Sequence, residues 1–231
     1  CKSMGIEVAA PDVNESFMTF AVVPGEKKIR YALSAIKNVG EGPIEIIENA
    51  RKEGGRFTSL EDFIRRTASN EINKKSLESL IKCGALDEFG ERKKMLMSID
   101  SILGYSQNIR KEKDSCQIDI FGNAVGCDEI TKITMANVPA ATDKERLDWE
   151  KELLGIYISS HPMTQYRDFI GTKFRAIGDM KDSDEGKDVK VLGVISKIQK
   201  IITRSKEPML FVTIEDFMGQ LELLIFPKTY A

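Results

Sequence analysis

Two glycine-containing segments of the sequence have the residue types that a phosphate-binding turn requires. The first glycine turn is Lys37-Asn38-Val39-Gly40-Glu41-Gly42, and the second is centred on Gly84. Glycine adopts positive φ without strain and lets a ligand approach the backbone, and Asn38 tolerates the same conformation. If a helix begins directly after such a turn, its first N–H groups and its dipole both favour an anion. The two segments therefore predict two backbone sites for phosphate groups.

Basic residues near both turns favour the phosphates of duplex DNA as the ligand. The candidate DNA-binding residues are Lys37, Asn38, Val39, Gly40, Glu41, Gly42, Lys82, Gly84, Ala85, Arg92, Lys93 and Lys94. Because the net charge of the chain is −2, binding would depend on local clusters and backbone dipoles. The alternative interpretation is a pair of ordinary helix–turn–helix corners, each with glycine at a helix end.

A third candidate site is the peptide Gln117-Ile118-Asp119-Ile120-Phe121, which lies in a segment without helical or strand periodicity. We interpret it as an anchor peptide in which Gln117 forms hydrogen bonds and Ile120 and Phe121 fill pockets on a partner. Burial of two such side chains contributes about 3–6 kcal/mol before ordering costs, which predicts reversible binding. The alternative is a strand fragment packed on the body of the protein.

The residue types give no sign of a catalytic or metal centre. The four cysteines form no CxxC pair and His161 is the only histidine, which argues against a closed zinc site. No strand-borne aspartate pair suits two-metal catalysis, and no P-loop motif occurs. The sequence also lacks a signal peptide and any run of about 18 apolar residues, so a membrane helix is not expected.

Hydrophobic periodicity predicts the helices that position these segments. A helical pattern begins at Ile29 and leads to the first glycine turn, and Pro43 suits the first position of the next helix. Ser59 and Asn73 have the residue types of helix N-caps. The predicted helices cover residues 29–37, 43–54, 60–66, 74–83, 91–109 and 147–154. Together they form a degenerate tandem repeat of helix, glycine turn and helix.

Strand periodicity dominates the end of the chain. Besides a strand at residues 17–23, three strands are predicted within residues 189–198, 209–217 and 220–226. The three resemble the beginning of a small OB barrel that the chain end cuts short. Such barrels bind single strands through basic and aromatic side chains. The candidates are Lys197, Lys200, Arg204 and Lys206, predicted on the loop between the first two strands, with Phe211 and Phe217 more simply explained as core residues.

In this order the features resemble one family, the alpha (polymerase) subunit of bacterial DNA polymerase III. The resemblance covers essentially the whole chain and is carried by PDVNES, IRYALSAIKNVGEG, LIKCGALD, QIDIF, LLGIYISSHPM and FVTIEDFMGQLELLIFP. It implies a mixed fold, with an α-helical tandem helix-hairpin-helix domain followed by a linker and a partial all-β OB-type barrel. The implied parts are the end of the fingers domain (1–28), the tandem helix-hairpin-helix domain (29–105), a linker with a clamp-binding peptide (106–145), a helical connector (146–187) and the N-terminal part of the OB domain (188–231).

The resemblance implies that the parent chain is a DNA-directed DNA polymerase, a nucleotidyltransferase of DNA replication in the cytoplasm. Its expected partners are duplex DNA, the sliding clamp (beta subunit), single-stranded template DNA and other replisome subunits, with no membrane. The family's catalytic aspartates precede Cys1, so no catalytic residue, metal or cofactor is expected in this segment, while the parent polymerase needs Mg²⁺. A first residue other than methionine agrees with a fragment.

Two residues depart from the family pattern. Asn38 replaces a glycine that is often found in such hairpins, and Ile120 stands where the clamp peptide usually has leucine. The first change should matter little, because asparagine tolerates the same backbone conformation. The second should lower the affinity for the clamp modestly.

Two rival functions remain open from the sequence. One is a non-catalytic protein-interaction module in which the turns are mere corners. The other is a fragment of a DNA-repair nuclease that uses the same hairpins.

Overall fold

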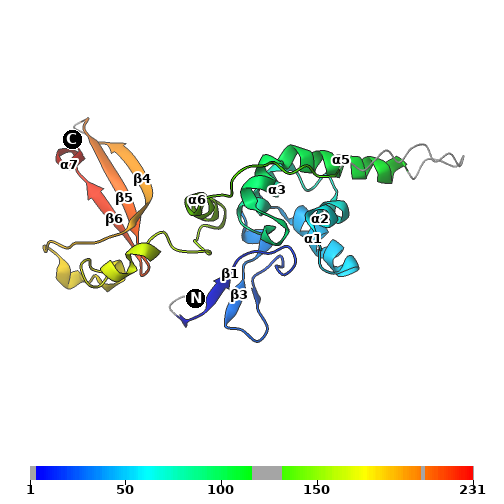
Figure 1. Cartoon of the computed structure of the whole chain (residues 1–231). Coiled ribbons are helices and arrows are strands. Elements are labelled where there is room, and N and C mark those ends of the chain that lie inside the picture. The colour runs from blue at the N-terminus through cyan, green and yellow to red at the C-terminus, as the bar shows by residue number, and fades with distance from the viewer. Residues whose placement is uncertain (1–3, 116–131, 204–205, 231) are drawn as a thin grey trace, which may run out of the picture. The chain divides into compact units, whose positions relative to one another are not determined.

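The computed structural model describes residues 4–115, 132–203 and 206–230 of the chain (Figure 1). The chain divides once, into a first unit over Cys1–Ser159 and a second unit over Ser160–Ala231. The finer division into five parts stays a prediction. The candidate peptide Gln117–Phe121 and the basic residue Arg204 lie outside the described residues.

A small sheet precedes the helices of the first unit. Its strands are β1 (Glu7–Ala9), β2 (Ala21–Val22) and β3 (Lys28–Arg30). The central strand β3 is parallel to β1 and antiparallel to β2, and Ile29 pairs with Val8 on one side and Val22 on the other. The helix predicted from Ile29 is therefore wrong, because this backbone pairs with two other strands. The strand predicted at residues 17–23 shrinks to β2.

The helices confirm most of the predicted positions. Within the described part of the first unit they are α1 (Glu41–Gly54), α2 (Leu60–Thr67), α3 (Lys74–Lys82), α4 (Arg92–Met97), α5 (Ile99–Ser115) and α6 (Asp143–Leu154), with the 3₁₀ turns η2 (Leu33–Ala35) and η3 (Asp87–Phe89). None of the described helices is long and apolar enough to cross a membrane.

Capping side chains explain where several helices begin. Ser59 accepts a hydrogen bond from the Asp62 amide and Asn73 accepts one from the Ser76 amide, which confirms both predicted N-caps. Two boundaries differ from the prediction: α1 begins two residues before Pro43, and α6 begins four residues before Leu147. The predicted helix over residues 91–109 is two helices.

Ser98 separates α4 from α5. Its hydroxyl donates to Lys94 O at 2.8 Å and accepts from the Ala136 amide at 2.7 Å. The hydroxyl thus links the α4–α5 junction to the segment that follows residue 132. Apolar periodicity continues across the junction, since Met95, Ile99 and Ile102 are all buried. Periodicity alone therefore could not reveal the break.

One hydrophobic core joins the small sheet to the helices. Its fully buried side chains include Leu33, Ile36, Ile44, Ile47, Phe57, Phe63, Leu77, Leu80, Ile81, Leu86, Met95 and Ile102. A buried polar residue fixes the α1–α2 loop within this core. Asn14 Oδ1 accepts from the Phe57 amide at 2.7 Å, and Asn14 Nδ2 donates to Phe57 O at 3.0 Å. The PDVNES segment thus has a structural role.

The second unit contains the three predicted strands. They are β4 (Val194–Ile202), β5 (Pro208–Glu215) and β6 (Gln220–Ile225), followed by the short helix α7 (Pro227–Tyr230). They form an antiparallel meander in the order β4-β5-β6, with a bulge between Ile195 and Lys197. The described residues form a partial β domain, with no closed barrel among them. Its small core is centred on Ile177, Val212 and Ile214.

Loss of the Asn73 cap should lower the free energy of unfolding. Asn73→Ala removes the side-chain acceptor of the Ser76 amide, and we expect a loss of about 1 kcal/mol in urea unfolding. Asn49→Ala is the matched control, because Asn49 is exposed in the middle of α1. Since alanine has the higher helix propensity, the control should be neutral or slightly stabilising. Equal losses in both variants would contradict the capping role.

Candidate nucleic-acid interface

The first glycine turn is held in place by two helices. Asn38 has a φ of 68°, as its residue type predicts. The Lys37 amide donates to Leu153 O near the end of α6 at 3.0 Å. Asn38 Nδ2 donates to Ser79 Oγ of α3 at 3.3 Å, and Ser79 is buried. The shape of this turn is therefore fixed by the protein itself.

The start of α1 leaves three consecutive backbone N–H groups open. Gly40 is the N-cap, with φ −84° and ψ 176°, and α1 has no side-chain cap. Among the described residues, no acceptor forms a hydrogen bond with the amides of Gly40, Glu41 or Gly42. Pro43, at the next position, has no N–H and needs no acceptor. Gly40 and Glu41 are exposed, so this helix start can accept an anion from solution.

The second glycine turn is closed, which corrects the prediction of two open turns. Gly84 has a φ of 89° and ends α3. Its amide donates to Ile81 O at 3.1 Å, and the Ala85 amide donates to Leu80 O at 3.0 Å. These two bonds are the pattern of a Schellman motif at a helix end. Gly84 and Ala85 are also buried, so their amides serve the fold.

Arg92 belongs to a buried ion network. Its side chain is only 5% exposed, and it donates to both carboxylate oxygens of Asp87, at 2.8 and 2.7 Å. It also donates to Glu150 Oε1 at 3.3 Å and to Lys82 O at 3.1 Å. Burial alone would lower the pKa of Arg92, but the hydrogen bonds with Asp87 and the charge of Glu150 raise it overall. Each of its three nitrogen atoms thus donates to an acceptor of the protein.

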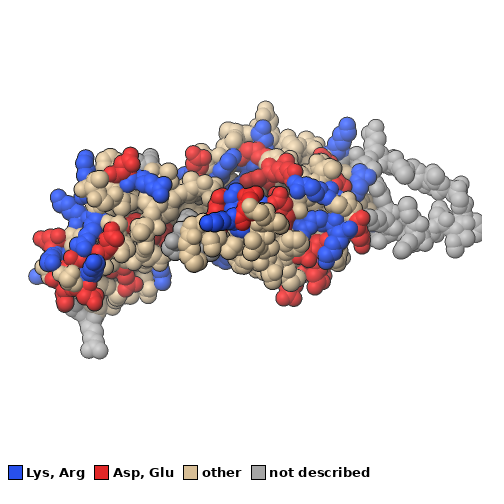
Figure 2. Space-filling view, turned by 90° about the horizontal axis from the view of Figure 1, so that it is seen from below, with Lys and Arg blue, Asp and Glu red and all other residues tan. Residues whose placement is uncertain are grey.

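The remaining predicted cations near the turns differ in their exposure and in their ion pairs. Lys93 Nζ lies 2.7 Å from Glu145 Oε1, and this hydrogen bond, with those from Thr142, lowers the pKa of Glu145 to about 2. Lys37 is exposed, while Lys82 and Lys94 are half-buried. Figure 2 shows basic and acidic side chains interspersed over the face in view. Charge alone therefore does not mark a nucleic-acid surface on that face.

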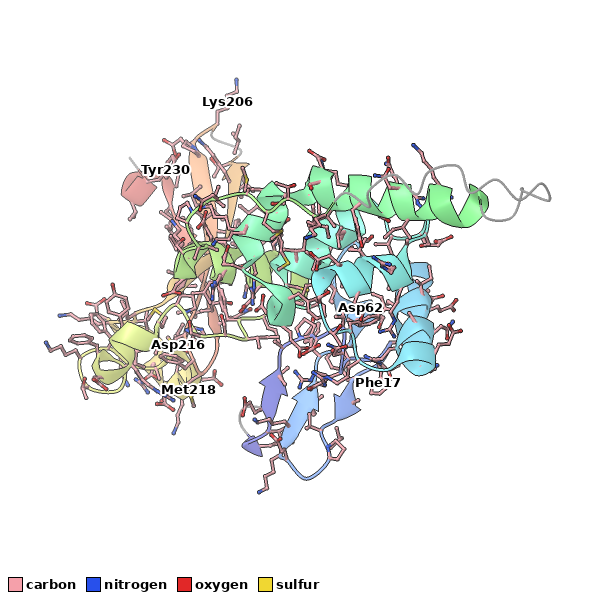
Figure 3. The ribbon with its side chains drawn as sticks, turned by 45° about the vertical axis from the view of Figure 1, so that its right-hand side comes forward. Phe17, Asp62, Lys206, Asp216, Met218 and Tyr230 are labelled. Atoms are coloured by element: carbon pink, nitrogen blue, oxygen red, sulfur yellow. The ribbon has the colours of Figure 1, made fainter. Side chains whose placement is uncertain are left out.

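The predicted single-strand contacts do not share one loop. Lys197 and Lys200 lie within β4, opposite Thr213 and Leu210 of β5, so the prediction that they lie on the loop is wrong. An odd spacing puts their side chains on opposite faces of the sheet. Lys206 does lie on the loop and is exposed. Figure 3 shows it at the same end of the sheet as Tyr230, whose hydroxyl accepts from Lys200 Nζ at 3.2 Å.

The two predicted aromatic residues have different surroundings. Phe211 is half-buried in β5, opposite Gln199 and Leu224. The ring of Phe217 lies 4.6 Å from that of His161 and 5.3 Å from the Arg167 guanidinium carbon. Both contacts hold Phe217 within its own unit. Within the described ranges, no group of three or more His, Cys, Asp or Glu side chains is arranged as metal ligands.

Sequence reasoning missed two acidic residues. Glu150 is 2% exposed and lies on the same helical face as the buried Leu153 and Leu154. That spacing, an acid on an apolar stripe, was a signal that could have found it. Glu71 lies against Gly42 at the start of α1, where the position of a Cβ on Gly42 would be 2.5 Å from Glu71 Oε2. No pattern in the sequence indicates that Glu71 lies close to Gly42.

Comparison with known proteins identifies the class of this interface. A sequence model of the family described as "Helix-hairpin-helix motif" matches residues 5–96, which include both glycine turns. The open turn at the start of α1 and this match define a helix-hairpin-helix region within the first unit. Such motifs support a role in DNA binding.

Whole-chain comparisons identify the family. The chain is 33% identical over 245 residues to DNA polymerase III subunit alpha of Saccharopolyspora erythraea, covering 100% of this chain and 20% of that protein. It is 35% identical over 233 residues to the protein of the same name from Thermus aquaticus (99% and 18% covered) and 34% identical over 242 residues to that from Mycobacterium tuberculosis strain H37Rv (100% and 20% covered). The chain belongs to the DNA polymerase III alpha subunit family, and it spans about a fifth of the length of these curated relatives.

Replacement of Arg92 separates a structural role from a DNA contact. Arg92→Ala leaves Glu150 buried without its cation, and we expect the free energy of unfolding to fall by about 3–5 kcal/mol. Arg92→Lys keeps the charge but loses the paired hydrogen bonds with Asp87, so its loss should be smaller. Urea unfolding at neutral pH measures both. An alanine variant with wild-type stability but reduced duplex affinity would contradict the structural role.

Proposed function

We propose that this chain holds duplex DNA through the first glycine turn, as part of a DNA polymerase III alpha subunit. The observation that carries the proposal is the start of α1, where the amides of Gly40, Glu41 and Gly42 have no acceptor among the described residues. A phosphate oxygen is the acceptor that suits amides at a helix start. The parent chain is proposed to be a DNA-directed DNA polymerase that requires Mg²⁺. Its proposed location is the cytoplasm.

The closed second turn changes the expected strength of binding. A charge-assisted hydrogen bond contributes about 1.5–3 kcal/mol, and with one open turn the backbone contact is about half of what two turns would supply. Such a contact alone corresponds to a dissociation constant weaker than about 1 mM. Exposed cations such as Lys37 can add to it. The turn therefore suits an accessory grip on DNA that other attachments keep close.

The peptide Gln117–Phe121 is proposed as one of those attachments, with the sliding clamp (beta subunit) as its partner. Its sequence supports this proposal, since Ile120 and Phe121 are apolar residues within a polar segment. A second attachment raises the effective concentration of DNA at the first glycine turn. Contacts with other replisome subunits belong to the same proposal.

Single-stranded template DNA is a further proposed ligand, for the second unit. Lys206 is the best supported contact, because it is exposed on the loop between β4 and β5. Lys197, on the face opposite Lys200, is the next candidate. Arg204 lies outside the described residues, and its role stays a prediction.

The rival functions rest on different observations. The closed second turn favours the protein-interaction module, because in that module the glycine turns are only structural corners and need no open amides. A repair nuclease would also need catalytic carboxylates. Duplex binding measured at several salt concentrations separates the first rival from the proposal, because phosphate contacts weaken steeply with salt.

One amide of the first glycine turn can be removed without disturbing the helix. Glu41 occupies the first position of α1, where proline is well tolerated, and the extended conformation of Gly40 suits a residue before proline. Glu41→Pro removes the N–H and the charge, whereas the matched Glu41→Ala removes only the charge. We expect the proline variant to bind a labelled duplex about tenfold more weakly than the alanine variant, as loss of one charge-assisted bond predicts.

Circular dichroism and unfolding curves provide the control for that comparison. Both variants should keep the wild-type helix content, because Pro43 already follows two residues later. Equal duplex affinities of two well-folded variants would show that this amide does not contact DNA, and the proposed grip would be wrong.

The clamp proposal is tested with the full chain and a bacterial sliding clamp. Gln117→Ala combined with Phe121→Ala removes the proposed hydrogen bond and the larger apolar anchor, and we expect binding in isothermal titration to fall at least tenfold. Asn123→Ala, two residues beyond the peptide, is the control and should bind like the wild type. Unchanged binding by the double variant would eliminate this peptide as the clamp site.

A further inference from the structure

An acidic side chain lies beside the start of α1, the helix end where phosphate is proposed to bind. Glu71 Oε2 is 2.5 Å from the position that a Cβ on Gly42 would occupy, at the second helical position of α1. Glu71 is exposed, and no salt bridge of the described residues includes it. Its carboxylate lies beside the start of α1, where the helix dipole is positive.

The backbone around Glu71 is fixed on both sides. Ile72 is 9% exposed and packs in the core, and its amide donates to Ser69 Oγ at 3.4 Å. The Asn73 amide donates to Glu71 O at 3.1 Å, and Asn73 is the N-cap of α3. The carboxylate thus extends from a rigid bend between α2 and α3, while its own side chain has no anchor in the protein.

Glycine at position 42 agrees with this placement. Gly42 lies in the helix, so its conformation is open to any residue, and the glycine is not needed for its φ. A Cβ at this position would meet the Glu71 carboxylate. The absence of a side chain therefore makes room for an acid beside the first turn of α1.

We propose that Glu71 is a built-in competitor of the DNA phosphate at the first glycine turn. In the free protein its carboxylate is the anion beside the start of α1, and it moves away when a phosphate binds. Both anions gain from the same helix dipole, and they repel each other if they remain together. The inference rests on the proposed function, because it concerns the affinity of that same site for DNA.

Glu71→Gln tests this competition with almost no change in shape. In the full chain at low salt, we expect the variant to bind a labelled duplex about two- to fivefold more tightly than the wild type, and the gain should shrink as salt rises. Glu53→Gln changes the net charge equally, but at the exposed C-terminal end of α1, and should give less than half of that gain. Equal gains in the two variants, or no gain at position 71, would overturn the proposal.

A readout without DNA keeps the two proposals distinguishable. Inorganic phosphate is titrated while the NMR signals of the Glu41 and Gly42 amides are followed. We expect these signals to shift at lower phosphate concentration in Glu71→Gln than in the wild type, and identical titrations would overturn the role of Glu71. If neither protein binds duplex but the phosphate titrations differ, the proposed DNA function is wrong and the competition stands.

Thermal unfolding separates competition from a purely structural role. Loss of the Glu71 charge should lower the melting temperature slightly, because the carboxylate stabilises the start of α1 in the free protein. We therefore expect Glu71→Gln to bind phosphate and duplex more tightly than the wild type while melting at a slightly lower temperature. A lower melting temperature together with weaker or unchanged phosphate and duplex binding would show that Glu71 serves the fold alone.

Discussion

The candidate interface depends on one constraint, that a helix cannot supply acceptors for its own first N–H groups. At four of the other described helices a side chain meets this need: Ser59 for α2, Asn73 for α3, Glu91 for α4 and Thr142 for α6. At α1 the N-cap is Gly40, which has no side chain to offer. Water or a ligand must then be the acceptor. An anion is better than water there, because the helix dipole adds to the hydrogen bonds.

The closed second turn supports the first one through a series of contacts. Gly84 ends α3, and beyond this turn Arg92 donates to Lys82 O at the end of α3. Arg92 also donates to the buried Glu150 of α6. Three residues later, Leu153 O of the same helix accepts from the Lys37 amide. The buried ions therefore position the helix end that fixes the first glycine turn. The two similar sequence repeats thus differ in structure: the first is the candidate site, and the second supports it.

Glu150 also explains why this support is rigid. Its second oxygen, Oε2, accepts from the amides of Ile158 and Ser159, both at 3.0 Å, and from Ser159 Oγ at 3.1 Å. A buried carboxylate costs much less when every lone pair has a donor. With Arg92 on one oxygen and three donors on the other, this acid joins the α3–α4 turn, α6 and the end of the first unit. All of these hydrogen bonds of Glu150 lie within the first unit.

Local patterns predicted much of the fold, because helix caps and strand alternation depend on residues that are close together in the sequence. Ser59, Asn73 and the three strands of the second unit were confirmed for that reason. The helix expected from Ile29 was wrong, since its backbone pairs with β1 and β2, and the residue pattern of one segment does not show which strands it pairs with.

The candidate site was only half predictable for a related reason. The residue types of the two turns are alike, but whether an amide is open depends on the element that comes after the glycine. After Gly40 a helix begins at once, whereas after Gly84 the chain forms a Schellman motif and the 3₁₀ turn η3 before α4 begins. Glycine predicts a turn, and the direction of the next helix decides whether the turn can bind. Leu86 is buried in the core and Arg92 donates to Glu150 of α6, so that direction depends on residues distant in the sequence.

A weak grip is consistent with the charges around the open turn. Glu41 and Glu71 lie beside the amides that would hold a phosphate, and Lys37 is the exposed cation of the turn. Acids at such a place lower the affinity for any single phosphate, because like charges repel each other. Attachment to DNA would then have to come from a second contact with a separate partner, since one open helix start supplies only about 1.5–3 kcal/mol.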